Sequence, residues 1–202
     1  MNTTNTLQFI LDKFQVKESR SPIRLPIGRN DLAALFGELH FLMGVEIGVE
    51  SGEYSEVLLS TIPNLHLIMI DPWRPYKGYR DHVTQEKLDE FMKEAHRRTS
   101  TYTRWVIRDT SVGALKMVRD ETQDFVYIDG NHDFLHVTQD ICYWLPKLRK
   151  GGILAGHDYR RVKGQYINHV KDVVEAYTYS HHISPWFVCA GDSAPSWFWV
   201  VE

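Results

Sequence analysis

The residues best suited to chemistry fall in two short segments, FVYIDGNHDF and ILAGHDY. In the first, an apolar run typical of a buried strand leads into Asp129, a turn glycine and then His132. In the second, a similar run leads into His157 and Asp158. Two convergent carboxylates repel each other unless a cation or a proton lies between them, and an imidazole titrates near neutral pH. These segments therefore suit either a metal site or acid–base chemistry.

Glycines mark a second candidate site, at the end of the apolar stretch MGVEIGV (43–49). Gly48 and Gly52 stand where this stretch passes into a predicted helix, and glycine there lets a ligand approach the backbone without meeting a β-carbon. The pattern lacks the third glycine of GxGxxG and the Gly-Lys-Ser/Thr of a phosphate loop, which disfavours a nicotinamide dinucleotide, ATP or GTP. Glu46 lies inside the stretch, where a charge is costly unless it is paired or hydrogen-bonded.

Carboxylates end the next two predicted strands. LHLIMID ends in Asp71, and TRWVIRD ends in Asp109, which is followed by Thr110 and Ser111. In open α/β sheets, ligands bind outside the carboxyl ends of the strands, so a carboxylate there is placed to accept hydrogen bonds from the hydroxyls of a ribose. A glycine turn beside two such carboxylates predicts a pocket for a nucleoside without a pyrophosphate.

The elements that must position these residues alternate between strand-like and helix-like periods. Strands are predicted at 43–49, 65–71, 103–109, 124–129 and 153–159, with helices at 30–41, 53–62, 84–99, 112–118, 134–148 and 168–179. A closing hairpin is predicted at 183–190 and 196–202. This order predicts an α/β fold: a Rossmann-like, doubly wound, seven-stranded sheet, mainly parallel with an antiparallel C-terminal hairpin, and with helices on both faces.

Composition and charge restrict the class of protein. The 202 residues suit one main domain at 28–202, preceded by a helical extension at 1–27 through which a homodimer could form. The net charge of −3 gives no reason to expect nucleic acid as a partner, and no apolar run is long enough to span a membrane. Cys142 and Cys189 are far apart in sequence, which favours a reduced, cytoplasmic protein.

The order of these motifs resembles the class I S-adenosylmethionine-dependent methyltransferases over roughly residues 40–202. The resemblance rests on Glu46-x-Gly48-x-x-x-Gly52 followed by Asp71, Asp109 and Asp129. It is greatest to a bacterial subgroup related to macrocin-type and catechol-type O-methyltransferases. The motifs of that subgroup match Asp129-Gly130-Asn131-His132, Pro146-Lys147-Leu148 and the segment from Gly151 to Tyr159.

The resemblance implies S-adenosylmethionine as cofactor and assigns residues to it. Gly48 and Gly52 would border its methionine portion, Asp71 would hold the ribose hydroxyls, and Trp73 would form a wall for the adenine. Asp109, or Ser111 nearby, would contact the adenine edge. The complete implied set is Glu46, Gly48, Gly52, Asp71, Trp73, Asp109, Ser111 and Asp129.

The reaction site implied by the resemblance includes Asp129, with His132 at the place of a catalytic lysine in the catechol-type relatives. His132 would take the proton from a substrate hydroxyl, bind a metal or cap the following helix, and His157 is the competing base. In metal-dependent relatives, the positions of Asp129 and Asp158 bind Mg²⁺. Here the candidate ligands are Asp129, Asp158 and His157, and an imidazole favours transition metals over Mg²⁺. A divalent cation and a metal-free site therefore both remain open.

The acceptor implied is the hydroxyl of a small molecule such as a sugar, a polyol or another natural product. Two alternatives remain: a related nucleoside-binding enzyme with hydroxylase-like metal chemistry, and a non-catalytic binding module on the same fold. Several aromatic residues could line an acceptor pocket or simply pack in the core, namely Trp73, Tyr76, Tyr79, Tyr159, Trp186 and Trp197.

Overall fold

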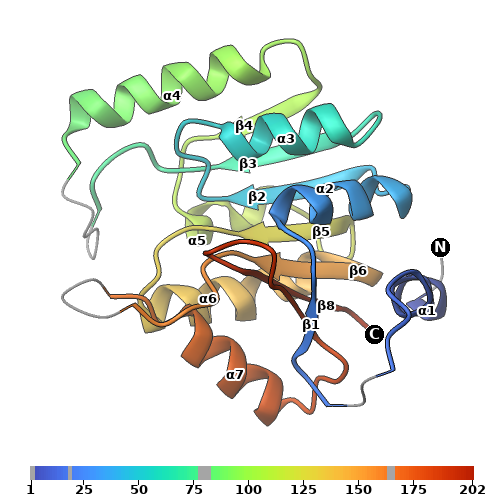
Figure 1. Ribbon diagram of the computed structural model, residues 1–202. Coiled ribbons are helices and arrows are strands. Elements are labelled where there is room, and N and C mark those ends of the chain that lie inside the picture. Colours follow the sequence, from blue (N-terminus) through green and yellow to red (C-terminus); the bar gives the residue numbers. More distant parts are fainter. Residues whose placement is uncertain (1–2, 18–19, 77–82, 163–166) are drawn as a thin grey trace.

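A computed structural model describes residues 3–17, 20–76, 83–162 and 167–202. Its centre is an eight-stranded sheet in the order β1-β7-β8-β6-β5-β2-β3-β4 (Figure 1). All neighbouring strands are parallel except where β8 pairs with β6 and β7. The strands are β1 (Ile23–Leu25), β2 (Met43–Ile47), β3 (His66–Ile70), β4 (Arg104–Ile107), β5 (Gln123–Ile128), β6 (Leu148–Gly156), β7 (Phe187–Cys189) and β8 (Ser196–Val200).

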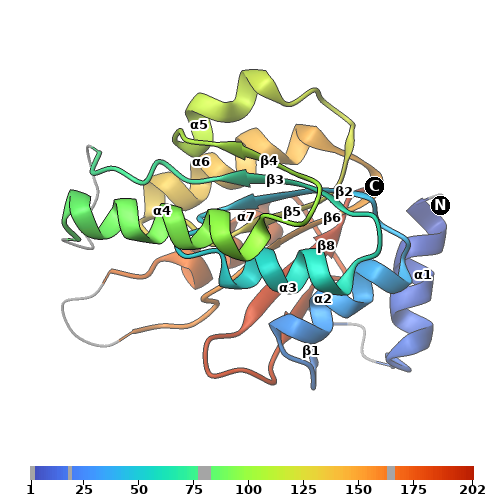
Figure 2. The ribbon, with the colours of Figure 1, turned by 90° about the horizontal axis from the view of Figure 1, so that it is seen from above.

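Helices cover both faces of the sheet (Figures 1 and 2). One face packs against α1 (Thr3–Lys13), α2 (Arg29–Glu38), α3 (Glu53–Thr61) and α4 (Gln85–Thr99). The other packs against α5 (Ser111–Ala114), α6 (Phe134–Trp144) and α7 (Val170–Ser180). Short 3-10 turns follow α5 at Leu115–Met117 and α6 at Leu145–Lys147.

Burial on both faces explains the apolar strand sequences. In β5, Phe125 and Tyr127 belong to the core beneath α1–α4, whereas Val126 and Ile128 belong to the core over α5–α7. Successive side chains of a strand point to opposite faces, so a strand covered on both sides reads as a continuous apolar run rather than an alternating one. A carboxylate within such a strand would be buried, so carboxylates are expected only where the strand ends.

The register aligns the carboxyl ends of the central strands. Ile47 of β2 pairs with Ile70 of β3 and with Ile128 of β5, and Ile128 pairs in turn with Gly156 of β6. Ile107 of β4 pairs with Ile70. The residues that follow these positions therefore leave the sheet along one edge, and they include every strand-end residue that the sequence singled out.

The predicted fold class is confirmed, with one strand more than expected. β1 lies within the segment predicted as a helical extension and adds a parallel strand beside β7. Three residues are too few to show a period, so nothing in the sequence distinguished them from a loop. The boundary at residue 27 remains a prediction. Among the described residues, no helix is both long enough and apolar enough to cross a membrane.

Candidate active site

A cleft of about 980 Å³ opens at the carboxyl edge of the sheet. Its lining comes from the turns after β2, β3, β5 and β6, from the first residues of α2, α3 and α5, and from one side each of α4 and α6. The volume lies within the range of sites that enclose small molecules and cofactors, about 300–1,000 Å³.

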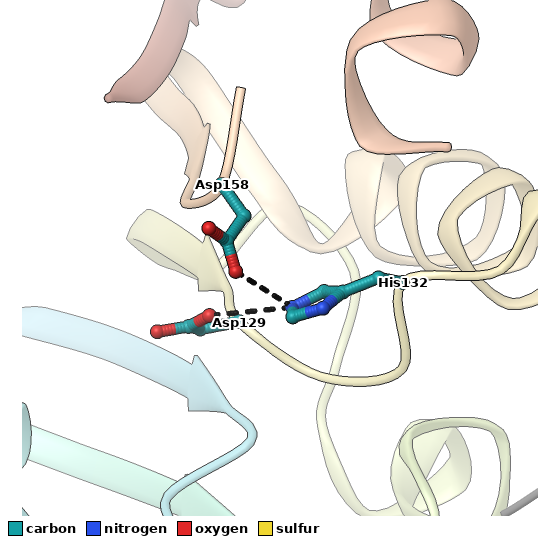
Figure 3. A group of neighbouring side chains, drawn as sticks. All are labelled: Asp129, His132 and Asp158. Carbon is teal, nitrogen blue, oxygen red and sulfur yellow. Dashed lines mark ion pairs between the residues drawn. The ribbon is translucent and has the colours of Figure 1, made fainter. Parts of the chain in front are cut away.

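Four residues that the sequence singled out meet at one end of this cleft. His132 Nε2 lies 3.3 Å from Asp158 Oδ2 and 3.7 Å from Asp129 Oδ1, so one ring nitrogen faces both carboxylates (Figure 3). His157 Nδ1 lies 3.5 Å from the other oxygen of Asp129. The side chains of His132, His157 and Asp129 remain 16–21% exposed, so they are accessible from the cleft.

Two arginines complete this cluster. Arg29 Nη1 donates a hydrogen bond of 3.2 Å to Asp129 Oδ2, and the Arg29 guanidinium lies 4.7 Å from the centre of the Tyr54 ring. Arg160 Nε lies 2.9 Å from Asp158 Oδ1. Burial alone would raise the pKa of the Asp129 carboxyl, but its contacts with His132 and His157 outweigh this and hold the pKa below the ordinary value. Asp129 is therefore ionised at neutral pH.

The same end of the cleft has the donors for a metal ion. Asp129, His132 and Asp158 each offer one ligand atom, and these atoms lie within 4.8 Å of one another. The predicted set contained His157 in place of His132. His157 follows β6 directly and contacts only the Asp129 side of the cluster in the ion pairs of the described chain, whereas His132 reaches both carboxylates.

The two glycines of the first turn have packing reasons for their identity. Gly48 has φ +85°, and a β-carbon there would lie 2.0 Å from the carbonyl oxygen of Asp129. Gly52 has φ +77°, and a β-carbon there would lie 2.8 Å from Cα of Ala95 in α4. Gly48 lines the cleft, whereas Gly52 is not among the described residues that line it. Contact of Gly52 with a cofactor remains a prediction.

Asp71 organises the backbone of the glycine turn. Its Oδ2 accepts hydrogen bonds of 3.0 Å from the amides of Val49 and Glu50, and its Oδ1 accepts one of 2.8 Å from the amide of Trp73. Burial raises the pKa of Asp71, and these backbone donors oppose the rise. Trp73 is 1% exposed and donates its indole N–H to the Glu50 carbonyl, so its ring is a fixed part of the cleft wall.

The buried carboxyl of Glu46 has a hydrogen-bond partner in α3. It is 2% exposed, and Ser55 of α3 donates a hydrogen bond to its carboxyl. Burial raises the pKa of Glu46 to about 8, despite the lowering effect of that hydrogen bond. Glu46 therefore lines the cleft largely as a neutral acid at pH 7.

The carboxylate of Asp109 lies against the start of α5, and its Oδ1 is 3.6 Å from Arg74 Nη2. Its Oδ1 accepts from the amide of Thr110, and a β-carbon on Gly113 would lie 2.5 Å from the carboxylate, which rests against the start of α5. Asp109 is not among the described residues that line the cleft, whereas Ser111 is. Contact of Asp109 with an adenine edge is thus unsupported by the geometry of this strand end and stays a prediction.

Arg29 and Asp140 are among the charged residues of the cleft that sequence reasoning missed. Arg29 begins α2, far in sequence from every motif, and no sequence signal indicates it. Asp140 lines the cleft from α6, is 3% exposed and accepts a hydrogen bond from Ser111. A signal existed for Asp140, because it lies on the apolar face formed by Val137, Ile141 and Trp144.

Five of the six aromatic residues that the sequence singled out are described, and two of them line the cleft. Trp73 and Tyr76 line the cleft. Tyr159, Trp186 and Trp197 are at most 5% exposed and pack in the core with α7. Tyr79 lies outside the described residues.

Comparison with known proteins decides the family. A family model described as a methyltransferase domain matches residues 45–159, which is more than half of the chain. The chain belongs to this family. The match includes the glycine turn, the strand-end carboxylates and the histidine–aspartate cluster, so the cleft is the candidate active site of a methyltransferase. A search of curated proteins found no match.

Solved structures show the same fold at low sequence identity. An O-methyltransferase from Bacillus cereus, solved in complex with SAH, is 14% identical, with 99% of this chain and 90% of that chain covered and a TM-score of 0.62. TomG from Streptomyces achromogenes, an O-methyltransferase involved in tomaymycin synthesis and solved with SAM, is 15% identical (99% and 89% covered, TM-score 0.60). The N-methyltransferase NodS from Bradyrhizobium japonicum is 17% identical (86% and 95% covered, TM-score 0.58).

Proposed function

We propose that this methyltransferase binds S-adenosylmethionine in the cleft and transfers its methyl group to a hydroxyl of a small molecule. The observation that carries the proposal is the meeting of Asp129, His132, His157 and Asp158 in a cleft that Gly48 of the glycine turn and Asp71 also line. Two of the solved O-methyltransferases of this fold contain SAH or SAM.

The cofactor half of the cleft fits the methionine and nucleoside portions of S-adenosylmethionine. Asp71 fixes the glycine turn through the backbone amides of Val49 and Glu50, and Gly48 has no side chain to fill the space beside it. We assign the ribose hydroxyls to Asp71 and the base to the space between Trp73 and Ser111. The sulfonium of the bound cofactor supplies an electrophilic methyl group, so the protein needs only to align the acceptor and take up its proton.

His132 is the base in this proposal. As the methyl carbon–sulfur bond breaks and the new carbon–oxygen bond forms, the acceptor hydroxyl loses its proton to the imidazole, and S-adenosylhomocysteine leaves. Asp129 and Asp158 then stabilise the imidazolium, because both side chains lie within 3.7 Å of His132 Nε2. His157 contacts the other oxygen of Asp129 and orients this carboxylate.

In this proposal the carboxylates of Asp129 and Asp158 face the protonated imidazole of His132 and do not bind a divalent cation. The three donors Asp129, His132 and Asp158 fit a metal ion in type and spacing. However, Arg29 already neutralises Asp129 and Arg160 already neutralises Asp158, at 3.2 and 2.9 Å. A divalent cation would meet two guanidinium groups as well as two carboxylates, which removes much of the electrostatic reason to bind one.

Methyl transfer from labelled S-adenosylmethionine to a panel of sugars, polyols, catechols and amines tests this function. We expect a labelled ether product with at least one hydroxyl acceptor and loss of labelling in His132→Ala. Labelling of amines alone would contradict transfer to oxygen. Equal labelling by wild type, His132→Ala and Asp129→Ala would contradict the assigned roles.

A further inference from the structure

Asp140 is a buried acid that is hydrogen-bonded to the Ser111 hydroxyl. Its carboxyl is 3% exposed, Oδ1 accepts a hydrogen bond from Ser111, and no ion pair to a cationic arginine or lysine is found among the described residues. A buried carboxyl of this kind is costly as an anion. Burial accordingly raises its pKa to about 7, against the lowering effects of Ser111 and of His136 on the same helix.

Asp140 lies where its buried carboxyl can reach a ligand in the cleft. Asp140 lines the cleft from α6, and its Oδ2 would lie 3.7 Å from a β-carbon built on Gly130, the residue after Asp129. Ser111, its hydrogen-bond donor, begins the helix that follows β4. Asp140 therefore stands where the turns after β4 and β5 approach each other, on the side of the sheet covered by α5 and α6.

The part of the cleft beside Asp140 is the space left for the adenine if Asp71 holds the ribose, so the inference rests on the proposed function. Trp73 forms one wall of that space, and the carboxylate of Asp109 lies against the start of α5. Among the described residues, Asp140 is thus a buried acid on the α5–α6 side of the cleft. It borders the space assigned to the adenine. A neutral carboxyl offers one O–H donor and one carbonyl acceptor side by side.

We propose that Asp140 is a specificity-determining residue that recognises the adenine of the cofactor through its N1/N6 edge. Its O–H donates to adenine N1, and its carbonyl oxygen accepts from the N6 amino group while still accepting from Ser111. The Ser111 hydroxyl donates to Oδ1, which keeps Oδ1 as the acceptor and Oδ2 as the O–H donor. With the donor and acceptor fixed in this order, a base with a 6-oxo group and an N1–H, such as hypoxanthine, presents the reverse pattern and places a donor against a donor. The pair therefore selects adenine over 6-oxopurines.

Two substitutions of Asp140 separate its hydrogen bonds from its volume. Asp140→Asn preserves the pattern, because an amide also offers one acceptor and donors side by side, whereas Asp140→Leu removes both groups at similar volume. The matched control is Glu46→Gln, which alters another buried carboxyl of the cleft that is hydrogen-bonded to a serine. Glu46 lies on the α3 side of the sheet, so its substitution changes affinity for cofactors with either base by the same factor.

Calorimetric titration with S-adenosylhomocysteine and with its inosine analogue tests the proposal. We expect wild type to prefer the adenine compound by about 5- to 150-fold, the range of one good bidentate pair. Asp140→Asn should stay within about threefold of wild type for S-adenosylhomocysteine, whereas Asp140→Leu should lose about tenfold or more and lose the preference. Circular dichroism checks that each variant is folded.

Three outcomes would overturn it. Wild type that binds both compounds equally contradicts base selection even if Asp140→Leu fails to fold. Asp140→Leu that is folded and keeps the full preference contradicts the role of this residue. Wild type that binds neither compound at millimolar concentration contradicts the proposed function itself, and this separates the two failures.

Discussion

The acidic residues in the two halves of the cleft have pKa values that are shifted in opposite directions. At the ends of β5 and β6, Asp129 is ionised, with its pKa held down by two histidines, and its carboxylate contacts Arg29. At the ends of β2 and in α6, Glu46 and Asp140 are buried beside serines, with pKa values raised to about 8 and about 7. The first half is suited to moving a proton, and the second to holding an uncharged nucleoside by hydrogen bonds.

The largest expected effect comes from the proton-transferring half. His132→Ala should lower the rate of methyl transfer about 10²- to 10⁴-fold, the usual contribution of a general base, while S-adenosylhomocysteine affinity changes less than about threefold. Single-turnover rates and calorimetry measure the two quantities separately. His66→Ala, which alters an exposed histidine at the start of β3 on the opposite edge of the sheet, is the control. A loss of S-adenosylhomocysteine affinity equal to the loss of rate would show that His132 acts in cofactor binding, which contradicts the division of the cleft into two halves.

Asp71→Ala should have the reverse effect in the cofactor half. The change removes the acceptor of three backbone amides, so we expect affinity for S-adenosylhomocysteine to fall about tenfold or more. Asp109→Ala removes a carboxylate that ends the neighbouring strand but faces α5, and affinity should stay within about twofold of wild type. If Asp109→Ala loses as much affinity as Asp71→Ala, the assignment of the ribose site is wrong.

Gly48→Ala should destabilise the protein where Gly130→Ala does not. A β-carbon at Gly48 would clash with the Asp129 carbonyl and would have to adopt φ +85°, a strain of about 1–3 kcal/mol or more. A β-carbon at Gly130 would have its nearest neighbour at 3.6 Å, an ordinary contact. Urea unfolding measures both. Equal free energies of unfolding for the two variants would show that the β2 and β5 turns do not approach as closely as described.

Stability should depend on pH with opposite signs in the two halves. Glu46 and Asp140 have folded-state pKa values above their ordinary values, so the folded protein binds more protons and the free energy of unfolding falls as pH rises from about 4 to about 8. Asp129 has a lowered pKa, so its contribution is present above about pH 4 and is lost on further acidification. Urea unfolding between pH 4 and 9 should show a flatter fall in Glu46→Gln and Asp140→Asn. Unchanged slopes in both variants would show that neither acid is held neutral.

The smallest expected effect is that of metal removal. Because Arg29 and Arg160 already pair with the two carboxylates, treatment with EDTA should change the transfer rate less than about twofold. Adding Mg²⁺, Mn²⁺ or Zn²⁺ after EDTA provides the control. A rate that collapses with EDTA and returns with one cation would assign Asp129, His132 and Asp158 to that cation instead.

The sequence predicted the parts of the site that follow the strands and missed those that approach from elsewhere. Asp71, Asp129 and Asp158 were predictable because an apolar run that ends in a carboxylate fixes both the strand end and the edge at which it lies. His132 and His157 were predicted at the same edge, but sequence spacing could not show which of them reaches both carboxylates. Arg29 reaches Asp129 across the fold, a contact that no local pattern records.

The same limit applies to the orientation of side chains at strand ends. Asp109 ends its predicted strand as Asp71 does, but Ile70 pairs with Ile107, so Asp71 is the first residue after β3 and Asp109 is the second after β4. The carboxylate of Asp109 packs over Gly113. Strand β1 was missed because a three-residue edge strand is defined by its pairing with β7 and not by its own residues. Local patterns therefore predicted which turns form the site, and tertiary contacts decided which side chains in those turns face it.

Calorimetric titration of the wild-type protein with S-adenosylhomocysteine tests the central claim most directly, since it requires no knowledge of the acceptor. We predict one binding site per chain, with a dissociation constant that rises in Asp71→Ala and is unaffected in His132→Ala. No heat of binding at millimolar ligand, or equal loss of affinity in both variants, would contradict the division of this cleft into a nucleoside-binding half and a proton-transferring half.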